Sequence, residues 1–192
     1  MGLDWRLFTI LNSLAGRSPV LDRIIQLLMN DYAIPTALVL SVFGLWFVGT
    51  SAATRERNQR AVLSAALSMI TANLVVKALN LVVYRFRPFA FHQVNLLFYY
   101  PSDSSFPSNA ASVGFSIATA VWLSNRKVGW WLYALAILLA VARVCGGVHY
   151  PADIIGGALI AMGCAYIIVR KARFLDLLWN GVIRLMRRLL LA

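Results

Sequence analysis

The sequence is poor in acidic residues, histidine and cysteine, and each shortage excludes a class of site. Only seven of its 192 residues are Asp or Glu, and it has two His and two Cys. Cys145 and Cys164 lie in apolar runs without a CxxC or Cys/His ligand spacing, so the sequence predicts neither a disulfide framework nor a zinc site. No cluster of carboxylates is available to hold a divalent cation, and we therefore expect no resident metal ion and no other cofactor.

Apolar residues, by contrast, are abundant. Hydrophobic residues make up 60% of the sequence, and the mean hydropathy is +0.73. A soluble domain of this size is not so apolar. The composition therefore predicts an all-α polytopic membrane protein, a single helical-bundle domain over residues 1–192 that is embedded in a lipid bilayer.

Five apolar runs are each close to the length that crosses the hydrocarbon core of a bilayer, about 20 residues. They cover residues 32–52, 61–84, 109–124, 129–147 and 151–169. Residues 3–14 and 18–30 are shorter and amphipathic, so we expect helices within 1–30 that lie at the interface or insert partly. The tail, 172–192, has apolar residues at helical spacing with Arg on the other face, which predicts an amphipathic helix on the cytoplasmic surface.

Basic residues gather in three clusters, and their placement predicts the orientation. Eleven of the 18 Lys and Arg lie at 55–60, 126–127 and 170–188. The positive-inside rule makes all three clusters cytoplasmic at once, with the linker 86–107 and the turn 146–151 outside. Basic clusters that punctuate apolar runs without interleaved aromatics favour membrane topology, so we expect no nucleic-acid partner. The sequence does not indicate an oligomeric state.

Polar residues that are costly near lipid fall together on the outer side of the predicted bundle, which indicates a functional site. Arg87 follows the second run, and Ser108 begins the third in FPSNAA, where the free N–H groups of a helix start can bind phosphate. Arg143, near the end of the fourth run, adds donors for the remaining phosphate oxygens. In GGVHYPADIIGG, His149 can attack phosphorus while Asp153 fixes the imidazole tautomer, and water would then hydrolyse the phosphohistidine.

These residues resemble the type-2 phosphatidic acid phosphatases, which are marked by the motifs K-x6-R-P, P-S-G-H and S-R-x5-H-x3-D. The third motif is nearly complete in ARVCGGVHYPAD, with Ala142 in place of Ser. The first is partial, because Asn80 stands where the family has Lys, while Lys77 lies one helical turn deeper on the same face. The resemblance covers about residues 77–157. It implies His149 as the nucleophile, Asp153 as its orienting residue, and Lys77, Asn80, Arg87, Ser108, Asn109 and Arg143 as candidate substrate-binding residues.

The second motif departs from the family at its end. Where the family has Gly and His after Pro-Ser, this sequence has Asn109 and Ala110. The resemblance assigns that His to protonation of the leaving oxygen, which is worth about 10²–10⁴-fold, so the chain as written is expected to be slow or inactive. Three explanations are open: a His-to-Ala change made to trap a substrate, natural loss of activity, or replacement by another acid. The otherwise intact site favours the first, and His92 is interpreted as an ordinary interfacial residue.

A site at the outer membrane face accepts an amphiphile whose phosphate lies at the interface and whose tail stays in lipid. The small size, the RFRPF form of the first motif and the outward site are similar to bacterial undecaprenyl pyrophosphate phosphatases. This implies conversion of undecaprenyl diphosphate to undecaprenyl phosphate at the outer face of a bacterial plasma membrane. Arg85 then either holds the second phosphate or is a snorkelling interfacial cation. A phosphatidylglycerophosphate or phosphatidate phosphatase, and a non-catalytic lipid-phosphate binder or flippase, are the alternatives.

Overall fold

The structure is a computed structural model that describes residues 2–172 and 174–189, and within these ranges every regular element is helical. The α helices are α1 (Leu3–Asn12), α2 (Pro19–Met29), α3 (Ala33–Phe47), α4 (Ala52–Val82), α5 (Asn109–Trp122), α6 (Arg126–Cys145), α7 (Pro151–Arg170) and α8 (Leu175–Arg188). A single 3₁₀ turn, η1 (Pro88–Ala90), lies in the linker between α4 and α5. The predicted all-α class is confirmed.

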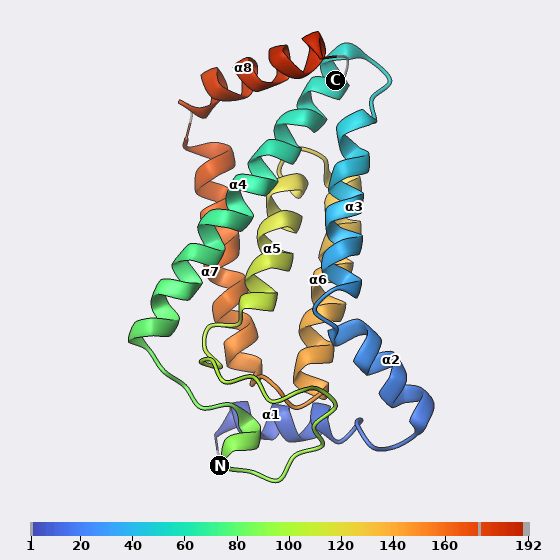
Figure 1. Ribbon diagram of the computed structural model, residues 1–192, viewed down its shortest axis with the longest axis vertical. Coiled ribbons are helices and arrows are strands. Elements are labelled where there is room, and N and C mark those ends of the chain that lie inside the picture. The colour runs from blue at the N-terminus through green and yellow to red at the C-terminus, as the bar shows by residue number, and fades with distance from the viewer. Residues whose placement is uncertain (1, 173, 190–192) are drawn as a thin grey trace.

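Helix α5 forms the centre of the bundle, with α4, α6 and α7 packed around it (Figure 1). Its sequence, NAASVGFSIATAVW, is rich in small residues, which allow neighbouring helices to approach closely. A Cβ added at Gly114 would lie 3.0 Å from the Cβ of Ala136 on α6. Because three helices pack against α5, the position of its N-terminus is fixed relative to the ends of those helices.

Local signals at the helix ends bring the predicted site together. Ser108 and Asn125 begin α5 and α6, and each accepts a hydrogen bond from a backbone N–H of the first turn. Gly147, at φ 85°, allows the tight turn after α6, and Pro151 is the first residue of α7. The starts of α5 and α7 and the end of α6 therefore meet at one end of the bundle (Figure 1).

Three helices, α4, α6 and α7, are long and apolar enough to cross a membrane. Helices α2 and α3, bent by 49° at their junction, pass the same test together and would make a fourth crossing. The run predicted over 109–124 forms α5, which has 14 residues, fewer than the roughly 20 that a crossing takes. The membrane helical bundle is confirmed, and the number of five crossings stays a prediction.

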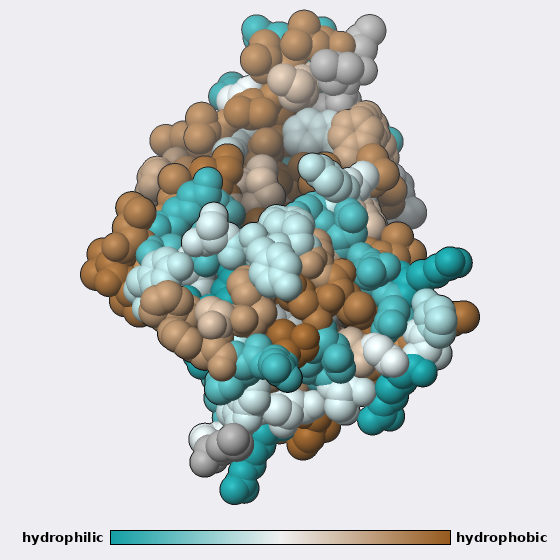
Figure 2. All heavy atoms as spheres, turned by 60° about the horizontal axis from the view of Figure 1, so that its bottom comes forward, coloured by the Kyte–Doolittle hydropathy of each residue, from teal (hydrophilic) through white to brown (hydrophobic). Residues whose placement is uncertain are grey.

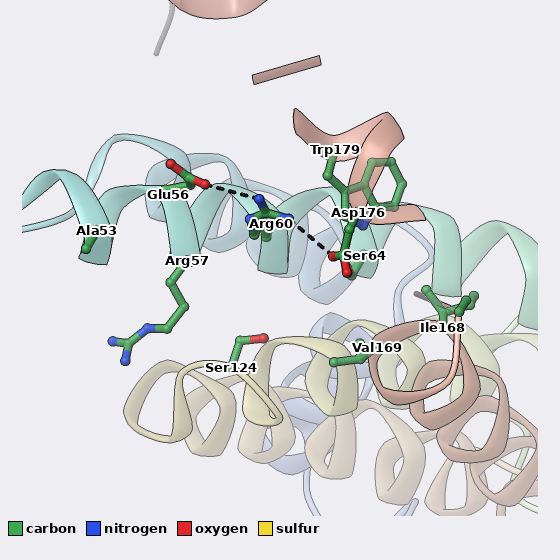
Figure 3. A pocket seen from close by; sticks show the side chains of 11 residues that line it. Ala53, Glu56, Arg57, Arg60, Ser64, Ser124, Ile168, Val169, Asp176 and Trp179 are labelled. Atoms are coloured by element: carbon green, nitrogen blue, oxygen red, sulfur yellow. Dashed lines mark hydrogen bonds and ion pairs between the residues drawn. The ribbon is translucent and has the colours of Figure 1, made fainter. Parts of the chain in front are cut away.

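Helix α8 lies across the end of the bundle that carries the basic clusters (Figure 1). It is amphipathic, as predicted for the tail, and it buries Leu175, Trp179 and Ile183. Arg60 of α4 pairs with Glu56 and with Asp176 of α8, which holds this helix to the bundle (Figure 3). Met1, Arg173 of the third basic cluster and residues 190–192 lie outside the described residues.

The opposite end is built from α1, α2 and the linker 83–108. Figure 2 looks toward this end, where hydrophilic and apolar side chains mix, while the flank of the bundle behind it is mostly hydrophobic. Asn12 of α1 joins the parts: its Nδ2 donates to the carbonyl oxygens of Asn95 and Cys145, and its Oδ1 accepts the N–H of Asn95. The short helices predicted within 1–30 thus cover the α6–α7 turn, and their depth in a membrane stays a prediction.

Candidate active site

Among the described residues, cavities are found at both ends of the bundle, and a comparison of one from each end locates the predicted chemistry at the linker end. The larger, about 430 Å³, lies at the basic end, where Arg60 is already engaged by Glu56 and Asp176 (Figure 3). Its lining residues include none of the predicted site residues. The smaller, about 290 Å³, lies at the linker end and includes His149 and Ala110. The smaller cavity, which we name the His149 cavity, is therefore the candidate active site.

Residues far apart in the sequence line the His149 cavity. They are Asp31, Pro35, Arg87, Tyr99, Pro101, Asp103, Asn109, Ala110, Val113, Leu139, Arg143 and His149. Five of the predicted site residues are among them. Ser108 and Asp153, which the sequence also singled out, are fully buried beside the cavity and support it.

In His149, which lies in the turn between α6 and α7, the ring nitrogen Nδ1 is held by the backbone and the other, Nε2, faces the guanidinium of Arg87. Its side chain is buried, and Nδ1 lies 3.0 Å from the carbonyl oxygen of Ser105. A carbonyl oxygen can only accept, so Nδ1 carries the proton and Nε2 has the lone pair. Burial lowers the pKa of the imidazole below its usual value, although Asp153 opposes the shift. At neutral pH, His149 is therefore an uncharged imidazole with a nucleophilic Nε2.

Asp153 supports His149 together with Ser105. Its Oδ2 accepts the backbone N–H of Tyr150 at 2.8 Å, which fixes the carboxylate in the first turn of α7. The same oxygen accepts the hydroxyl of Ser105 at 2.5 Å and lies 3.7 Å from Nδ1 of His149. The last distance is too long for a hydrogen bond. The sequence prediction that Asp153 itself holds the ring is thus modified: Ser105 supplies the hydrogen bond, and Asp153 supplies a nearby charge.

Arg87 lies against the reactive face of the imidazole. Its Nη1 is 3.3 Å from Nε2 of His149 and donates to the carbonyl oxygen of Val148 at 3.0 Å. Its Nη2 donates to the carboxylate of Asp103 at 2.8 Å. The guanidinium is nearly buried, so these contacts fix its plane. A group attacked by Nε2 would therefore lie within reach of Arg87 N–H donors.

Arg143, in the last turn of α6, provides the second guanidinium of the cavity. It pairs with Asp31 and lies over the ring of Phe98, 4.6 Å from the ring centroid. Its Nε is buried and has no hydrogen-bond partner among the described residues. Tyr99 donates to Asp31 at 3.0 Å, and burial together with this bond raises the pKa of Tyr99. Arg143 is thus held at one edge by a carboxylate and retains an unused donor.

The start of α5 forms the third wall. Ser108 is its N-cap: Oγ accepts the N–H of Ala111 at 3.4 Å, and the Ser108 N–H donates to the carbonyl oxygen of Asp153 at 3.0 Å. Ser108 therefore ties α5 to α7. Asn109 and Ala110 line the cavity in the first turn, where helix N–H groups have no intrahelical partner and favour an anion. The methyl group of Ala110 borders the cavity where the resemblance requires an imidazole.

Two predicted substrate-binding residues on α4 are not in the lining of the His149 cavity. Lys77 is exposed, and Asn80 is half-buried with an Oδ1 that has no hydrogen-bond partner. Both lie on α4, which ends at Val82, before the linker that brings Arg87 to the cavity. The part of the first motif that reaches the cavity is Arg87.

Arg85 also lies outside the lining. Arg85 and Arg87 are two residues apart in an extended segment, a spacing that favours the same side of the backbone. Arg87 contacts His149, whereas Nη1 of Arg85 lies 2.6 Å from Oδ1 of Asp153. The guanidinium of Arg85 contacts the carboxylates of Asp4 and Asp153, and the prediction that it holds a second phosphate, one of the two made for this residue, stays a prediction. His92 stacks on Trp5 at 3.9 Å outside the cavity, which agrees with an interfacial role.

Four residues of the site were missed as functional residues from the sequence: Ser105, Asp31, Tyr99 and Asp103. The scarcity of acidic residues could have pointed to the two aspartates. A carboxylate is costly near lipid, so one that is retained in an Arg-rich membrane protein is expected to pair with an arginine. Asp31 and Asp103 each pair with one of the cavity arginines. Their positions in loops gave no helical spacing from which that pairing could be predicted.

Comparisons with known proteins give the relatives of this chain. A model of the PAP2 superfamily matches residues 61–175. Undecaprenyl-diphosphatase BcrC of Bacillus subtilis is 30% identical over 176 residues, 92% of this chain and 86% of that protein. The bacitracin transport permease protein BcrC of Bacillus licheniformis is 30% identical over 156 residues, 81% and 73% of the two chains. The crystal structure of Aquifex aeolicus LpxE matches with a TM-score of 0.64 and 27% identity, covering 88% of this chain and 96% of that chain. The chain therefore belongs to the PAP2 superfamily.

Proposed function

We propose that this chain is a lipid phosphatase that acts through a phosphohistidine on His149 and removes the terminal phosphate of undecaprenyl diphosphate. The observation that carries the proposal is the unprotonated Nε2 of a neutral His149, which faces the guanidinium of Arg87 in a cavity that Arg143 also lines. The name of the Bacillus subtilis relative, undecaprenyl-diphosphatase, supports the choice of lipid.

In the first step, Nε2 of His149 forms a bond to the terminal phosphorus, and the bond from that phosphorus to the bridging oxygen breaks. The electron pair of that bond leaves with the lipid monophosphate. Arg87 and Arg143 neutralise the charge on the phosphoryl oxygens, and the first N–H groups of α5 add donors. The reaction needs no metal ion in this scheme, because guanidinium and helix N–H groups supply the positive potential.

In the second step, water attacks the phosphohistidine, the bond between phosphorus and Nε2 breaks, and inorganic phosphate leaves. The same group that protonates the leaving oxygen in the first step would take a proton from this water. In this chain Ala110 stands where that group is expected. A phosphate leaving group is less basic than an alkoxide, so cleavage of a diphosphate depends less on protonation than cleavage of a monoester. Any residual activity of the unaltered chain is therefore expected to be higher on diphosphates than on monoesters.

Apolar cavities next to the site support a substrate with a hydrocarbon tail. A cavity of about 230 Å³ borders α4 and shares Val113 with the His149 cavity. A further cavity of about 160 Å³ shares Met69 with it and continues to Val39 and Ile117. These walls are almost entirely apolar and lie within the part of the bundle expected in the bilayer. A phosphate in the His149 cavity would thus lie near apolar cavities, the first of which shares the lining residue Val113 with it.

We place the reaction at the outer face of the membrane. The His149 cavity lies at the end of the bundle opposite α8 and the described basic residues of the three clusters (Figure 1). If the positive-inside rule holds for this chain, that end faces away from the cytoplasm. The lipid would then reach the cavity from the outer leaflet of a bacterial plasma membrane.

The test is the substitution Ala110→His, assayed in detergent as inorganic phosphate released from undecaprenyl diphosphate, phosphatidylglycerophosphate and phosphatidate. Restoring a general acid should raise the rate on the preferred lipid by about 10²-fold or more. The gain should disappear on adding His149→Ala and should persist in chelator. The control Ala118→His places the same side chain on α5, at a buried position away from the cavity.

The outcomes separate the alternatives. A preference for the glycerolipids would change the proposed substrate but would still support a phosphatase. Lipid binding without hydrolysis by the Ala110→His protein would instead favour a non-catalytic binder or flippase, the alternative that agrees with the permease name of the Bacillus licheniformis relative.

A further inference from the structure

The carboxylate of Asp153 is connected to the N-terminal helix through Arg85. Nη1 of Arg85 lies 2.6 Å from Oδ1 of Asp153, and Nη2 lies 2.6 Å from Oδ2 of Asp4 in the first turn of α1. The guanidinium also stacks on the ring of Tyr150, 4.2 Å from its centroid. One arginine therefore joins a fully buried carboxylate of α7 to a partly exposed one of α1.

Asp4 makes a second contact with the same region. Its Oδ1 accepts the backbone N–H of Ala152 at 2.9 Å, one residue before Asp153. Phe8, one helical turn further along α1, is buried and packs against Val144 and Tyr150. One carboxylate oxygen of Asp4 thus accepts from the backbone at the start of α7, and the other contacts Arg85. An amphipathic helix that needed only to lie at the interface would not require these polar contacts.

We propose that Asp4 of α1 is a positioning residue for catalysis: it shares Arg85 with Asp153 and thereby sets the alignment and basicity of His149. The proposal rests on the proposed function, because it assigns Asp4 to the alignment of the nucleophile. Asp4 touches neither substrate nor the reacting atoms. It acts through Arg85 and Asp153, and through Ser105 beyond them.

The charge balance explains why a shared arginine matters. Asp153 is fully buried and accepts three hydrogen bonds, from Arg85, Ser105 and the Tyr150 backbone. A guanidinium bound only to Asp153 would neutralise that carboxylate more completely. Because Asp4 draws on the same guanidinium, more negative charge remains on Asp153 to stabilise a proton, or a phosphoryl group, on the imidazole.

Substitutions at Asp4 and at Arg85 are expected to shift the pKa of His149 in opposite directions. Replacing Asp4 by Asn removes a negative charge and leaves Arg85 to Asp153 alone, so the pKa of His149 should fall. Replacing Arg85 by Gln removes the positive charge beside Asp153, so the pKa should rise. The other charged groups near the ring stay in place in both variants. They are Arg87 and Asp103 of the linker, Arg143 of α6, Asp153 of α7 and Asp31 between α2 and α3; the α5 residues at the cavity, Asn109 and Ala110, are uncharged.

The first measurement is an imidazole titration by NMR of protein labelled with ¹³C-histidine. The chain has only two His, and His149→Asn assigns the signals. We expect the His149 midpoint to move down in Asp4→Asn and up in Arg85→Gln, each by about half a unit, as for a charge one group removed from the titrating pair. The control is Asp22→Asn on α2, because Asp22 also accepts a backbone N–H, that of Gly16 at 2.8 Å. Equal midpoints, or shifts of the same sign, would overturn the proposal.

The second measurement is binding of vanadate, a mimic of phosphoryl transfer that needs neither lipid nor a general acid. Asp4→Asn should weaken vanadate about tenfold, and Asp4→Glu should recover part of the loss, because alignment of Nε2 is affected and the cavity is otherwise intact. Unchanged affinity in Asp4→Asn would refute the positioning role. If the unaltered protein and the Ala110→His protein both bind no vanadate, the proposed function is wrong, and the titration signs still decide whether Asp4 acts on His149. Arg85→Met, which also removes the charge and keeps a side chain of similar length, replaces Arg85→Gln should the latter fail to fold, with the same expected sign.

Discussion

The hydroxyl of Ser105 donates to Oδ2 of Asp153 at 2.5 Å, and the two residues support the imidazole of His149 although Nδ1, 3.7 Å from that oxygen, donates to the carbonyl oxygen of Ser105 instead. Ser105 contributes twice, since its carbonyl oxygen accepts from Nδ1 and its hydroxyl fixes the carboxylate. Its side chain is fully buried, and its backbone N–H donates to the carbonyl oxygen of Arg85 at 2.8 Å. The linker therefore supplies part of the machinery and does not only connect two helices.

The hydroxyl of Ser105 should matter for rate more than for binding. Ser105→Ala leaves the carbonyl oxygen to hold Nδ1 but releases Asp153 from one of its donors, so kcat in the Ala110→His background should fall about tenfold with KM nearly unchanged. Ser116→Ala is the matched control, because that buried hydroxyl bonds only the carbonyl oxygen of Val113. Steady-state kinetics with undecaprenyl diphosphate decide it: an equal loss in both variants would mean that Ser105 is only a packing residue.

The acid side of the pH profile should reflect His149. Burial lowers its pKa below the usual value of about 6.5, so the nucleophile stays neutral to lower pH and the acid limb of kcat/KM in the Ala110→His protein should lie below that value. The unfolded chain takes up this proton at higher pH than the folded chain. The group therefore contributes stability above about pH 6.5, and this is lost as the pH falls through the folded-state pKa.

Rate profiles and thermal unfolding from pH 4 to 8 check both effects. The control for the native imidazole outside the cavity is His92→Gln, and thermal unfolding of the unaltered chain with Ala110 is the control for the imidazole introduced at residue 110. An acid limb above pH 6.5 that is unchanged in His92→Gln would contradict the assignment of a buried neutral nucleophile.

The carboxylates paired with the cavity arginines should weaken anion binding. Asp103 pairs with Arg87 and Asp31 with Arg143, and both carboxylates are partly exposed. An incoming phosphate competes with them for the same guanidinium donors. Asp103→Asn should therefore tighten vanadate or phosphate about threefold to tenfold by removing a competing charge. Calorimetric titration measures this, and Asp176→Asn at the opposite end is the control. Weaker binding in Asp103→Asn would indicate that the carboxylate is needed to hold Arg87 in place.

The helical bundle and the central pair of the site could be predicted because their signals are local. Long apolar runs give the helices, Ser108 and Asn125 mark their starts, and His149 and Asp153 are four residues apart in one motif. Such patterns depend on backbone spacing and residue type, which the sequence states directly. Arg87 and Arg143 could be added because both occupy the same predicted side of the membrane.

The other contacts of the site depend on the path of the loops, which local sequence patterns do not indicate. Whether Arg85 turns toward a phosphate or toward Asp153 is decided by the linker, and the spacing RFR fits either outcome. Asp4 lies 149 residues from Asp153 in the chain, and its contact with Ala152 arises only when α1 folds across the start of α7. Lys77 matched a motif position only approximately, and the helix that carries it leaves it exposed and outside the cavity lining, so its role in substrate binding stays a prediction.

The orientation of the bundle can be tested by labelling single cysteines with a membrane-impermeant maleimide. Gln93 is exposed in the linker at the end of the His149 cavity, and Lys127 is exposed in the second basic cluster at the other end. In a background in which Cys145 and Cys164 are replaced by Ala, Gln93→Cys should react in intact cells and Lys127→Cys only after permeabilisation. The physical reason is the cost of carrying Lys and Arg clusters across the membrane, which leaves them in the cytoplasm. Retained vanadate binding controls for folding of the cysteine-free background. Reaction of Lys127→Cys, and not Gln93→Cys, in intact cells would put the His149 cavity on the cytoplasmic side, and the lipid would then have to reach it from the inner leaflet.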